Sequence, residues 1–458
     1  MSKVEDYKDY VLVSGGGIVA HYSAKFLAAK GVKVLLIHSS QAFRESEFVY
    51  INGKLDSTYS DAHGKGGLSK FWEFQLMQPS PCAFEDRPWI STGVGLADKK
   101  LFEKEEIALQ KDLQLHFFSD MRLPWGRRQN REILLPVLSQ FLSHERYFEI
   151  FNVENSPNIQ VFNGFIVHSF KESSTLERME VEVRDLEGRP TKILCKALVL
   201  AAGTIGNAKI LNSTQAVYKK NLWPVLGKMV QDHQIISLGA FRPKSRKSSR
   251  FAIPTFQKYG STWKQKFQIA NLTSASAETP DFAIEVTPLI SYPNFESGVA
   301  KFFGRLSNAF SRWIFVKFGL DLDHKHRSVQ CEILTEDYHE NRQELVFEKD
   351  KVFVQKVSTS TVEFGNVRKL TIDALSKEGY EPCDTNQFAT RSAYHLMGST
   401  PMGNSVLDSV VDLTGTLHGF SRVKILGLSS LSAVGFVNPT FSALVNARVF
   451  LEDLVINS

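Results

Sequence analysis

Three segments decide the fold of this chain: Tyr10-Val-Leu-Val13, Gly15-Gly-Gly-Ile-Val-Ala20 and Val32-Lys-Val-Leu-Leu-Ile37. The first and third are apolar runs typical of buried strands. The residues after the glycines keep helical spacing, and Gly31 is placed to end that helix. This order of strand, glycine turn, helix and strand predicts a βαβ unit of a parallel sheet.

The glycine turn has the pattern Gly15-x-Gly17-x-x-Ala20. The first glycine permits a tight turn, the second lets the backbone approach a pyrophosphate, and the small third residue lets helix and strand pack closely. The helix N-terminus would stabilise the phosphate charge. An acidic residue usually ends the second strand and holds a ribose, but His38 stands there and is expected to hydrogen-bond the ribose hydroxyl. The alternative is an ordinary βαβ turn that binds nothing.

A second glycine cluster lies in residues 61–72 and contains Gly66 and Gly67. Glycines at this density allow the backbone to lie against a flat ligand, because they carry no side chain. A surface turn is the alternative interpretation. We keep both glycines as candidate cofactor contacts.

Residues 158–195 change to the alternating pattern of strands. Met179, Val181 and Val183 share one face, and a turn at Glu187-Gly188 leads into a returning strand. We therefore predict a β-meander inserted into the nucleotide domain. A further buried strand at 197–203 returns to the parallel sheet and ends at a glycine, with Ala202 and Gly203 before the next helix.

Residues 236–390 are rich in aromatic residues and alternating runs, which predicts a second, mainly antiparallel α+β domain. The first domain is then discontinuous, α/β and Rossmann-like, and comprises residues 1–235 and 391–458. The basic stretch 242–250 is interpreted as a solvated loop. Residues 301–317 form an amphipathic pattern that either packs on the second domain or contacts an anionic membrane surface.

Near the C-terminus, His395 opens the sequence His-Leu-Met-Gly-Ser-Thr-Pro-Met-Gly, and Asn438 opens Asn-Pro-Thr-Phe-Ser. A histidine and an asparagine in loops punctuated by glycine favour a polar site over a core. A neutral imidazole can accept the proton of a hydroxyl group, and an amide can hold that hydroxyl in place. His233 and His418 are interpreted as structural.

Composition narrows the class of protein. With 458 residues, 43% hydrophobic and 22% charged, the chain is long enough for two globular domains. A net charge of +5 is too small to indicate a nucleic-acid partner. Four cysteines lie far apart, so neither a metal site nor a CxxC pair is predicted. The polar N-terminus resembles no signal peptide, which predicts a cytoplasmic enzyme, with peripheral membrane contact through 301–317 left open.

Together these segments resemble the glucose–methanol–choline (GMC) oxidoreductase family, whose members bind FAD. The resemblance covers about 200 residues in family order, from the glycine turn through Gly66-Gly-Leu-Ser69 and Ala201-Ala-Gly-Thr-Ile-Gly206 to Gly227–His233, His395 and Asn438. The sugar-oxidising branch, which includes pyranose oxidases and glycoside 3-dehydrogenases, looks most similar. There, an Asn-Pro-Thr segment follows Gly-x-Ser at the spacing seen from Gly427 to Asn438.

The resemblance implies specific roles. His395 would accept the hydroxyl proton and Asn438 would position the substrate, while FAD accepts the hydride. Cofactor contacts are implied for residues of both ends of the chain: Gly15, Gly17, Ala20, His38, Gly66, Gly67, Ser69, Ala202, Gly203, Gly427, Asn438, Pro439 and Thr440. Some family members attach FAD through a histidine; Phe71 stands at that place, so noncovalent FAD is expected.

The leading function is FAD-dependent oxidation of an alcohol, on a sugar, glycoside or related polyol. Two alternatives remain open at this stage. A flavoprotein could need a membrane or protein partner, or lack independent catalysis. A hydroxynitrile lyase of the same family would use the histidine for proton transfer while the flavin stays oxidised. The sequence leaves the substrate and the electron acceptor undetermined.

Overall fold

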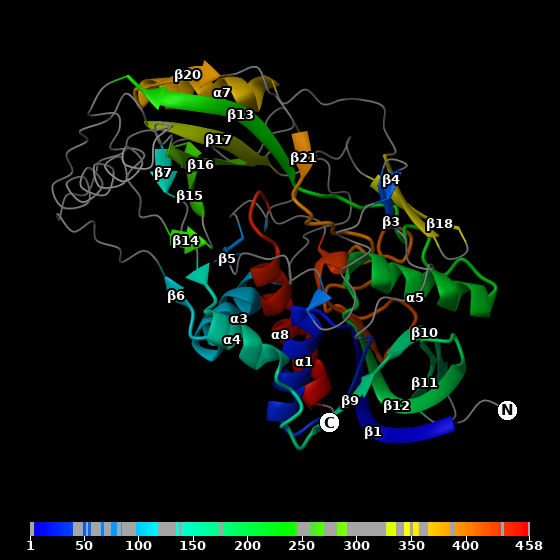
Figure 1. The fold of residues 1–458 in the computed structure, drawn as a ribbon. Coiled ribbons are helices and arrows are strands. Elements are labelled where there is room, and N and C mark those ends of the chain that lie inside the picture. The colour runs from blue at the N-terminus through cyan, green and yellow to red at the C-terminus, as the bar shows by residue number, and fades with distance from the viewer. Residues whose placement is uncertain are drawn as a thin grey trace, which may run out of the picture.

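The computed structural model contains a mixed sheet of mainly parallel core strands below an antiparallel sheet (Figure 1). This arrangement confirms the predicted fold class, a Rossmann-like α/β unit with an antiparallel second sheet. The structure describes residues 4–39, 49–51, 54–55, 66–67, 75–79, 84, 98–117, 134–136, 140–173, 177–244, 257–259, 262–269, 282–290, 327–335, 343–348, 351–356, 365–384, 390–431 and 435–456.

The core of the first sheet is parallel, with the order β12-β1-β2-β9 and β22 on the other side of β12. Its strands are β1 (Val4–Ser14), β2 (Lys33–His38), β9 (Ile159–Asn163), β12 (Pro190–Leu200) and β22 (Val423–Ile425). The apolar runs 11–13 and 34–37 are buried on both faces, as expected of strands in a parallel sheet. Helix α1 (Ile18–Ala29) joins β1 to β2, which confirms the predicted βαβ unit.

An antiparallel extension continues this sheet through β10 (Phe165–Ser173) and β11 (Arg178–Asp185). Met179, Val181 and Val183 pair with Cys195, Ile193 and Thr191, so the predicted hairpin has the predicted residues on its buried face. Two details differ from the prediction. Residues 190–200 form one continuous strand rather than two, and β9 belongs to the parallel core. One long strand joins the antiparallel and parallel parts of this sheet, because residues 190–195 pair with β11 and residues 192–200 pair with β1.

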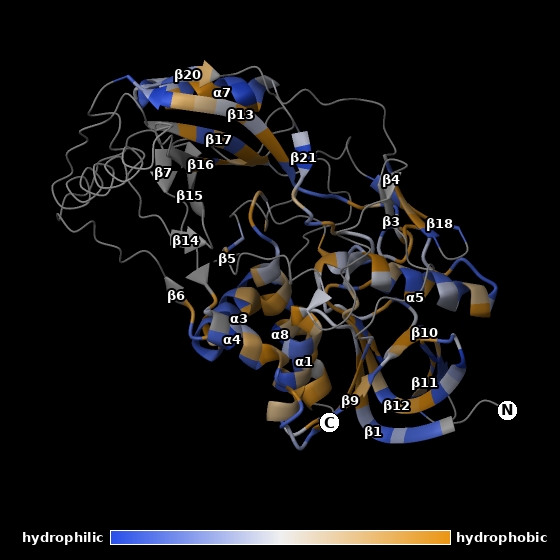
Figure 2. Cartoon of the chain, in the orientation of Figure 1, coloured by the Kyte–Doolittle hydropathy of each residue, from blue (hydrophilic) through white to orange (hydrophobic). Residues whose placement is uncertain are grey.

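Helices cover this sheet unequally. In Figure 1 one group of helices lies together, namely α1, α3 (Lys99–Asp112), α4 (His144–Phe151) and α8 (Thr440–Ile456). Helix α5 (Gly203–Tyr218) lies apart from this group, against β10. Figure 2 shows apolar residues along α1 and α8, which contact each other. Within the described ranges, no helix is long and apolar enough to cross a membrane.

One charged cluster holds α1, α3 and α8 together. The Arg448 guanidinium donates to Glu105 at 2.8 Å and to the Tyr22 hydroxyl at 2.7 Å, and it lies 3.3 Å from Asp112. The side chains of Arg448 and Glu105 are only 11% and 7% exposed. Burial, together with the nearby Asp112 carboxylate, raises the pKa of Tyr22 well above its ordinary value. The cluster therefore keeps a neutral phenol between charged partners.

The antiparallel sheet follows the order β14-β15-β16-β17-β13-β20, and β7 and β21 pair at its sides. Its strands are β13 (Gln234–Pro243), β14 (Gln257–Tyr259), β15 (Thr262–Ile269), β16 (Phe282–Ile290), β17 (Arg327–Thr335), β20 (Tyr380–Asp384), β21 (Thr390–Ser392) and β7 (Leu134–Pro136). Helix α7 (Gly365–Lys377) packs on it through Val367, Ala374 and Leu375, which share a core with Phe241.

Two small sheets join distant parts of the chain. One has the order β18-β19-β3-β4, with strands β18 (Gln343–Glu348), β19 (Lys351–Lys356), β3 (Val49–Ile51) and β4 (Lys54–Leu55). The other has the order β5-β8-β6, with strands β5 (Gln75–Leu76), β8 (Gln140–Phe141) and β6 (His116–Phe117). Residues 49–51 and 134–136 thus pair with strands from the predicted second domain.

Several predicted features fall only partly on this structure. The segment 301–317 lies outside the described residues. Of the basic stretch 242–250, the described part is tied to neighbours: Arg242 donates to Glu381 at 2.7 Å and Lys244 to Ser376 at 3.3 Å. Cys195, Cys331 and Cys383 are free thiols, and burial raises the pKa of Cys195 to about 12. No group of metal-binding side chains gathers among the described residues.

Candidate active site

Three parallel strands end side by side, and the candidate site begins at these ends. The backbone N–H of Ala201 donates to Ser14 at 2.8 Å, and that of Leu426 donates to Leu200 at 2.8 Å. The segments after β1, β12 and β22 therefore leave the same edge of the sheet. Ligands of open parallel sheets bind beyond this carboxyl edge.

Gly15 is required by the protein itself. Its φ is +140°, and a Cβ built there would lie 2.2 Å from the carbonyl oxygen of Ala201. Its N–H donates to Ile37 at 2.9 Å, so the residue is fixed between two neighbouring strands. Only glycine combines this backbone angle with this close approach.

Gly17 is different, because none of the described residues occupies the space where its side chain would lie. A Cβ built on Gly17 meets no described atom within 4 Å. Gly17 is also the N-cap of α1, in extended conformation with φ −81° and ψ 175°, and no side chain caps the helix. Open space beside an uncapped helix N-terminus fits the pyrophosphate of a dinucleotide such as FAD. Ala20 is fully buried in the core shared with the strands, as its predicted packing role requires.

The glycines at 66 and 67 meet this turn from another part of the chain. Gly66 donates to the carbonyl of Gly16 at 2.7 Å and forms a parallel bridge with Gly17. Gly66 and Gly67 both have positive φ, of 104° and 51°. The structure thus brings the two glycine clusters together, while Ser69 lies outside the described residues.

His38 ends β2 and pairs with Asn163 of β9. It is 7% exposed, and its ring centroid lies 5.3 Å from that of His21 on α1. This is the end of the second strand, where a ribose is held in dinucleotide-binding folds. The position fits the predicted role, although a neutral ring offers a weaker partner than a carboxylate.

A second helix start faces the same edge. Gly203 opens α5 with φ +78°, and the N-cap residue Ala202 makes no side-chain cap. Asn207 ties this turn together: its Oδ1 accepts from Ala202 at 2.8 Å, and its Nδ2 donates to Leu426 at 3.2 Å. Gly427 follows with φ +92°, has open space beside it, and leads into the short 3-10 helix η7 (Leu428–Ser430). Asn207 was not predicted as a site residue; its bond to Leu426 spans 219 positions, so no local signal reveals it.

The segment after His395 lies between α5 and η7. Thr204 Oγ1 donates to Leu396 at 2.6 Å, and Ser399 Oγ donates back to Thr204 at 2.7 Å. Gly398 N–H donates to Leu428 at 3.1 Å. These bonds fix residues 396–399 against α5 and η7. His395 is therefore held at the boundary between the two large sheets.

His395 itself contacts His233. Their Nδ1 atoms are 3.0 Å apart, and the two rings are nearly perpendicular at 89°. His233 is 2% exposed, whereas His395 is partly exposed. His233, interpreted from the sequence as structural, lies in direct contact with the candidate base.

Asp232 anchors the same loop. Its Oδ1 accepts the backbone N–H of His395 at 2.8 Å, and its Oδ2 accepts the Ser392 hydroxyl. Tyr394, between these two residues, has a positive φ of 59°. A non-glycine residue in this region costs on the order of 1–3 kcal/mol and is held by its surroundings, commonly at functional sites.

Asn438 precedes α8, which begins at Thr440, and Pro439 accepts the N–H of Ala443 at 2.9 Å. Asn438 and Thr440 are partly exposed and Pro439 is buried. Met397, two residues after His395, and Val437, next to Asn438, belong to one hydrophobic cluster. The loops that carry His395 and Asn438 are therefore packed against a common core.

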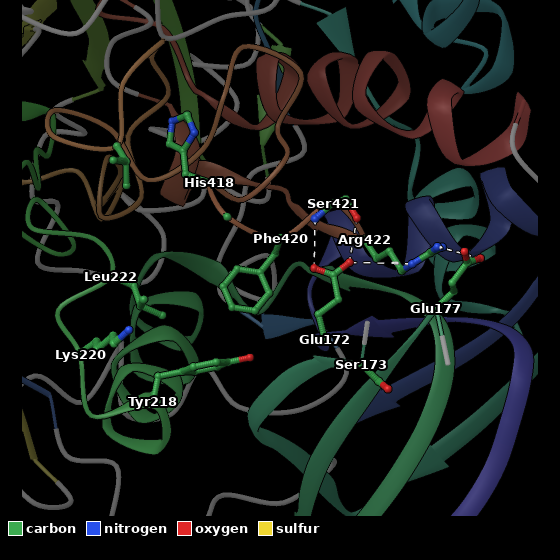
Figure 3. A pocket seen from close by; sticks show the side chains of 12 residues that line it. Glu172, Ser173, Glu177, Tyr218, Lys220, Leu222, His418, Phe420, Ser421 and Arg422 are labelled. Carbon is green, nitrogen blue, oxygen red and sulfur yellow. Dashed lines mark hydrogen bonds and ion pairs between the residues drawn. The ribbon is translucent and has the colours of Figure 1, made fainter. Parts of the chain in front are cut away.

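A cavity of about 890 Å³ lies elsewhere, between β10, the end of α5 and residues 406–422 (Figure 3). Its described lining includes none of the predicted catalytic or cofactor residues. Arg422 lies 3.8 Å from Glu172 and 3.6 Å from Glu177, and Phe420 faces the cavity beside Tyr218. His418, which lines it, contacts Ser409 at 2.8 Å and accepts from Trp223 through its carbonyl, in keeping with a structural role.

Comparisons with known proteins agree with this geometry. Residues 339–447 match the family model described as GMC oxidoreductase. The solved structure of pyridoxine 4-oxidase from Mesorbium loti has a similar fold, with a TM-score of 0.57 over 97% of this chain and 99% of that chain. At 13% identity, this likeness shows the fold alone. No curated protein matches the sequence.

The matched segment contains both His395 and Asn438, and it ends inside α8. The shared fold extends well beyond this segment, because it covers 97% of the chain. The family implies FAD as the cofactor. Residues 339–447 are thus similar to the GMC oxidoreductases, a family that acts on CH–OH donors, and the fold of the whole chain agrees with that similarity.

Proposed function

We propose that this chain oxidises an alcohol with noncovalently held FAD, that His395 accepts the hydroxyl proton, and that Asn438 positions the hydroxyl group. The observation that carries the proposal is the fixed position of His395. Asp232 holds its backbone and His233 contacts its ring, at the boundary between the two large sheets. A partly exposed imidazole held this firmly is suited to general base catalysis.

The cofactor is proposed to lie along the carboxyl edge of the parallel sheet. Its pyrophosphate would approach Gly17, where the helix is uncapped and the space is open. Gly66 and Gly203 would bring backbone close to it, and His38 would face the ribose. When bound, FAD supplies the acceptor for the hydride that leaves the alcohol carbon. The residues of the chain supply orientation and proton transfer.

Sugars, glycosides and polyols are the proposed substrate class, on the basis of the Gly427-to-Asn438 spacing seen in the sequence. The structurally similar pyridoxine 4-oxidase makes pyridoxine the natural competitor in any test. Both classes carry the hydroxyl group that His395 and Asn438 would bind, so only direct comparison separates them.

The test uses purified protein, its visible absorption and the cofactor released on denaturation. Under anaerobic conditions, a panel of monosaccharides, glycosides, polyols and pyridoxine is mixed with the protein, and bleaching of the flavin is followed. We expect bleaching by at least one alcohol and its loss in His395→Ala. His418→Gln is the control, because His418 lies away from the candidate site and glutamine can keep its contact with Ser409.

Three outcomes would contradict the proposal. If no FAD is released on denaturation, the proposed cofactor is wrong. If the flavin of His395→Ala is bleached at the wild-type rate, His395 is not the base. Turnover of a cyanohydrin with the flavin oxidised throughout would instead indicate a lyase.

A further inference from the structure

We propose that His233 is a positioning residue for the alcohol oxidation proposed above: it accepts a hydrogen bond from Nδ1–H of His395 and thereby places the lone pair of His395 on Nε2, the nitrogen that would accept the substrate proton. The effect of His233 on the reaction rate rests on that proposed function. Its geometric basis, the contact between the two Nδ1 atoms at 3.0 Å, is independent of it.

Two ring nitrogens at this distance share a single hydrogen. A neutral imidazole carries one N–H and one lone pair, so one Nδ1 donates and the other accepts. If both carried hydrogens, the two N–H groups would point at each other, and a separation of 3.0 Å would be unfavourable. The pair therefore has two arrangements, which differ in the histidine that donates.

Only one arrangement leaves His395 able to act as a base. When His395 donates through Nδ1, its Nε2 carries the lone pair. When His233 donates, Nε2 of His395 carries the hydrogen and its Nδ1 is occupied. The first arrangement also suits the product of proton transfer, because protonated His395 keeps the same Nδ1–H donor. A hydrogen bond that becomes charge-assisted as the proton arrives favours the transition state over the ground state.

The surrounding backbone contacts hold His233 beside His395. Its backbone carbonyl accepts the N–H of Ala393 at 3.0 Å, and Gln231 exchanges two backbone bonds with Met397 at 3.0 and 2.9 Å. Bonds on both sides of His395 thus clamp residues 231–233 against 393–397. With 2% exposure, the His233 ring is costly to charge, so it is the partner expected to remain neutral.

The test compares His233→Asn with His233→Leu. Asparagine can place Oδ1 near the former Nδ1 and keep an acceptor, whereas leucine keeps the volume and removes the acceptor. The first readout is NMR of protein with ¹⁵N-labelled histidine, at a pH where free histidine is neutral. Loss of a signal in His395→Gln assigns that residue. We expect His395 in the Nδ1–H tautomer in the wild type and His233→Asn, and a shift toward Nε2–H in His233→Leu.

The second readout is the anaerobic rate of flavin bleaching by the alcohol found in the panel. We expect His233→Leu to lower the maximal rate by about ten- to a hundredfold. The substrate concentration for half-maximal rate should change little, and His233→Asn should restore most of the rate. A purely structural role would affect both variants according to their thermal stability and leave the tautomer unchanged.

The proposal is overturned if wild-type His395 is found in the Nε2–H tautomer, a result that needs no variant to fold. It is also overturned if His233→Leu keeps the wild-type tautomer and rate, or if His233→Asn loses as much rate as His233→Leu. If no alcohol bleaches the flavin, the proposed function fails, while the tautomer measurement still decides the hydrogen bond.

Discussion

Helices α1 and α3 both pack against α8, yet they begin in opposite ways. The first turn of α3 is capped by Asp98, whose carboxylate accepts from Lys100 at 3.0 Å and Leu101 at 3.2 Å. The first turn of α1 begins at Gly17, has no side-chain cap and faces open space. Every helix leaves its first N–H groups without helical partners. The α3 helix satisfies two of these groups with its own side chain, whereas the start of α1 has no such cap and is the place proposed above for the pyrophosphate.

The largest effect is expected from Gly15→Ala, which breaks the turn that sets the start of α1. The added Cβ would meet the Ala201 carbonyl oxygen at 2.2 Å, and neither backbone can move without disturbing the sheet. We expect a loss of more than about 4 kcal/mol in unfolding free energy, measured by denaturant titration. Gly31→Ala separates backbone strain from collision: its φ is also positive, at +85°, but its surroundings are open. It should cost only about 1–2 kcal/mol; equal losses would contradict the argument.

The next effect concerns the cluster that α1 and α3 share. Arg448→Met should lower the unfolding free energy by about 3 kcal/mol, because the buried carboxylate of Glu105 would lose its close partner and retain the contact at 3.5 Å to the exposed Lys104. Denaturant titration measures it. Arg146→Met is the matched control, since Arg146 pairs with Glu149 on the surface, where the side chains are 31% and 47% exposed. That variant should lose less than about 1 kcal/mol. Similar losses in both would show that burial is not the cause.

Gly17→Ser gives α1 the cap that α3 already has. Serine at an extended N-cap can accept a backbone N–H, so the FAD-free protein should gain a few tenths of a kcal/mol. The same side chain would occupy the space proposed for the pyrophosphate, and FAD should bind at least about tenfold more weakly, or 1.4 kcal/mol. Equilibrium titration of the FAD-free protein, followed by flavin fluorescence, measures this change. Unchanged affinity would place the pyrophosphate elsewhere.

The smallest effect is expected from Asp98→Ala, which removes the cap from α3. The loss of two accepted N–H bonds should lower the unfolding free energy by about 1 kcal/mol and leave FAD affinity unchanged. Asp98→Asn should retain most of the stability, because its amide oxygen can still accept. A change in FAD affinity in Asp98→Ala would contradict the idea that the start of α1, and not that of α3, contacts the cofactor.

Much of the fold follows from local patterns. The βαβ unit of residues 10–37 and the pairing of Met179 with Cys195 were both predictable, because burial alternates or runs continuously along a strand and glycine marks the turns. The sequence also singled out His395 and Asn438, and their roles remain proposals. From the sequence, residues 190–200 were divided into two strands. The reason is that an alternating pattern and a continuous apolar run stand next to each other there, and each pattern is typical of a separate strand.

Other features depend on contacts between distant residues. The sequence by itself determined the strand order near the N-terminus, the glycine turn and the chemical types of residue in the candidate site. Only the tertiary structure decided that β3 pairs with β19, that Gly66 meets Gly16, and that His233 contacts His395 across 162 positions. The physical reason is that backbone propensity and side-chain periodicity act over a few residues. Contacts across the chain arise only when separate elements bury their apolar faces together.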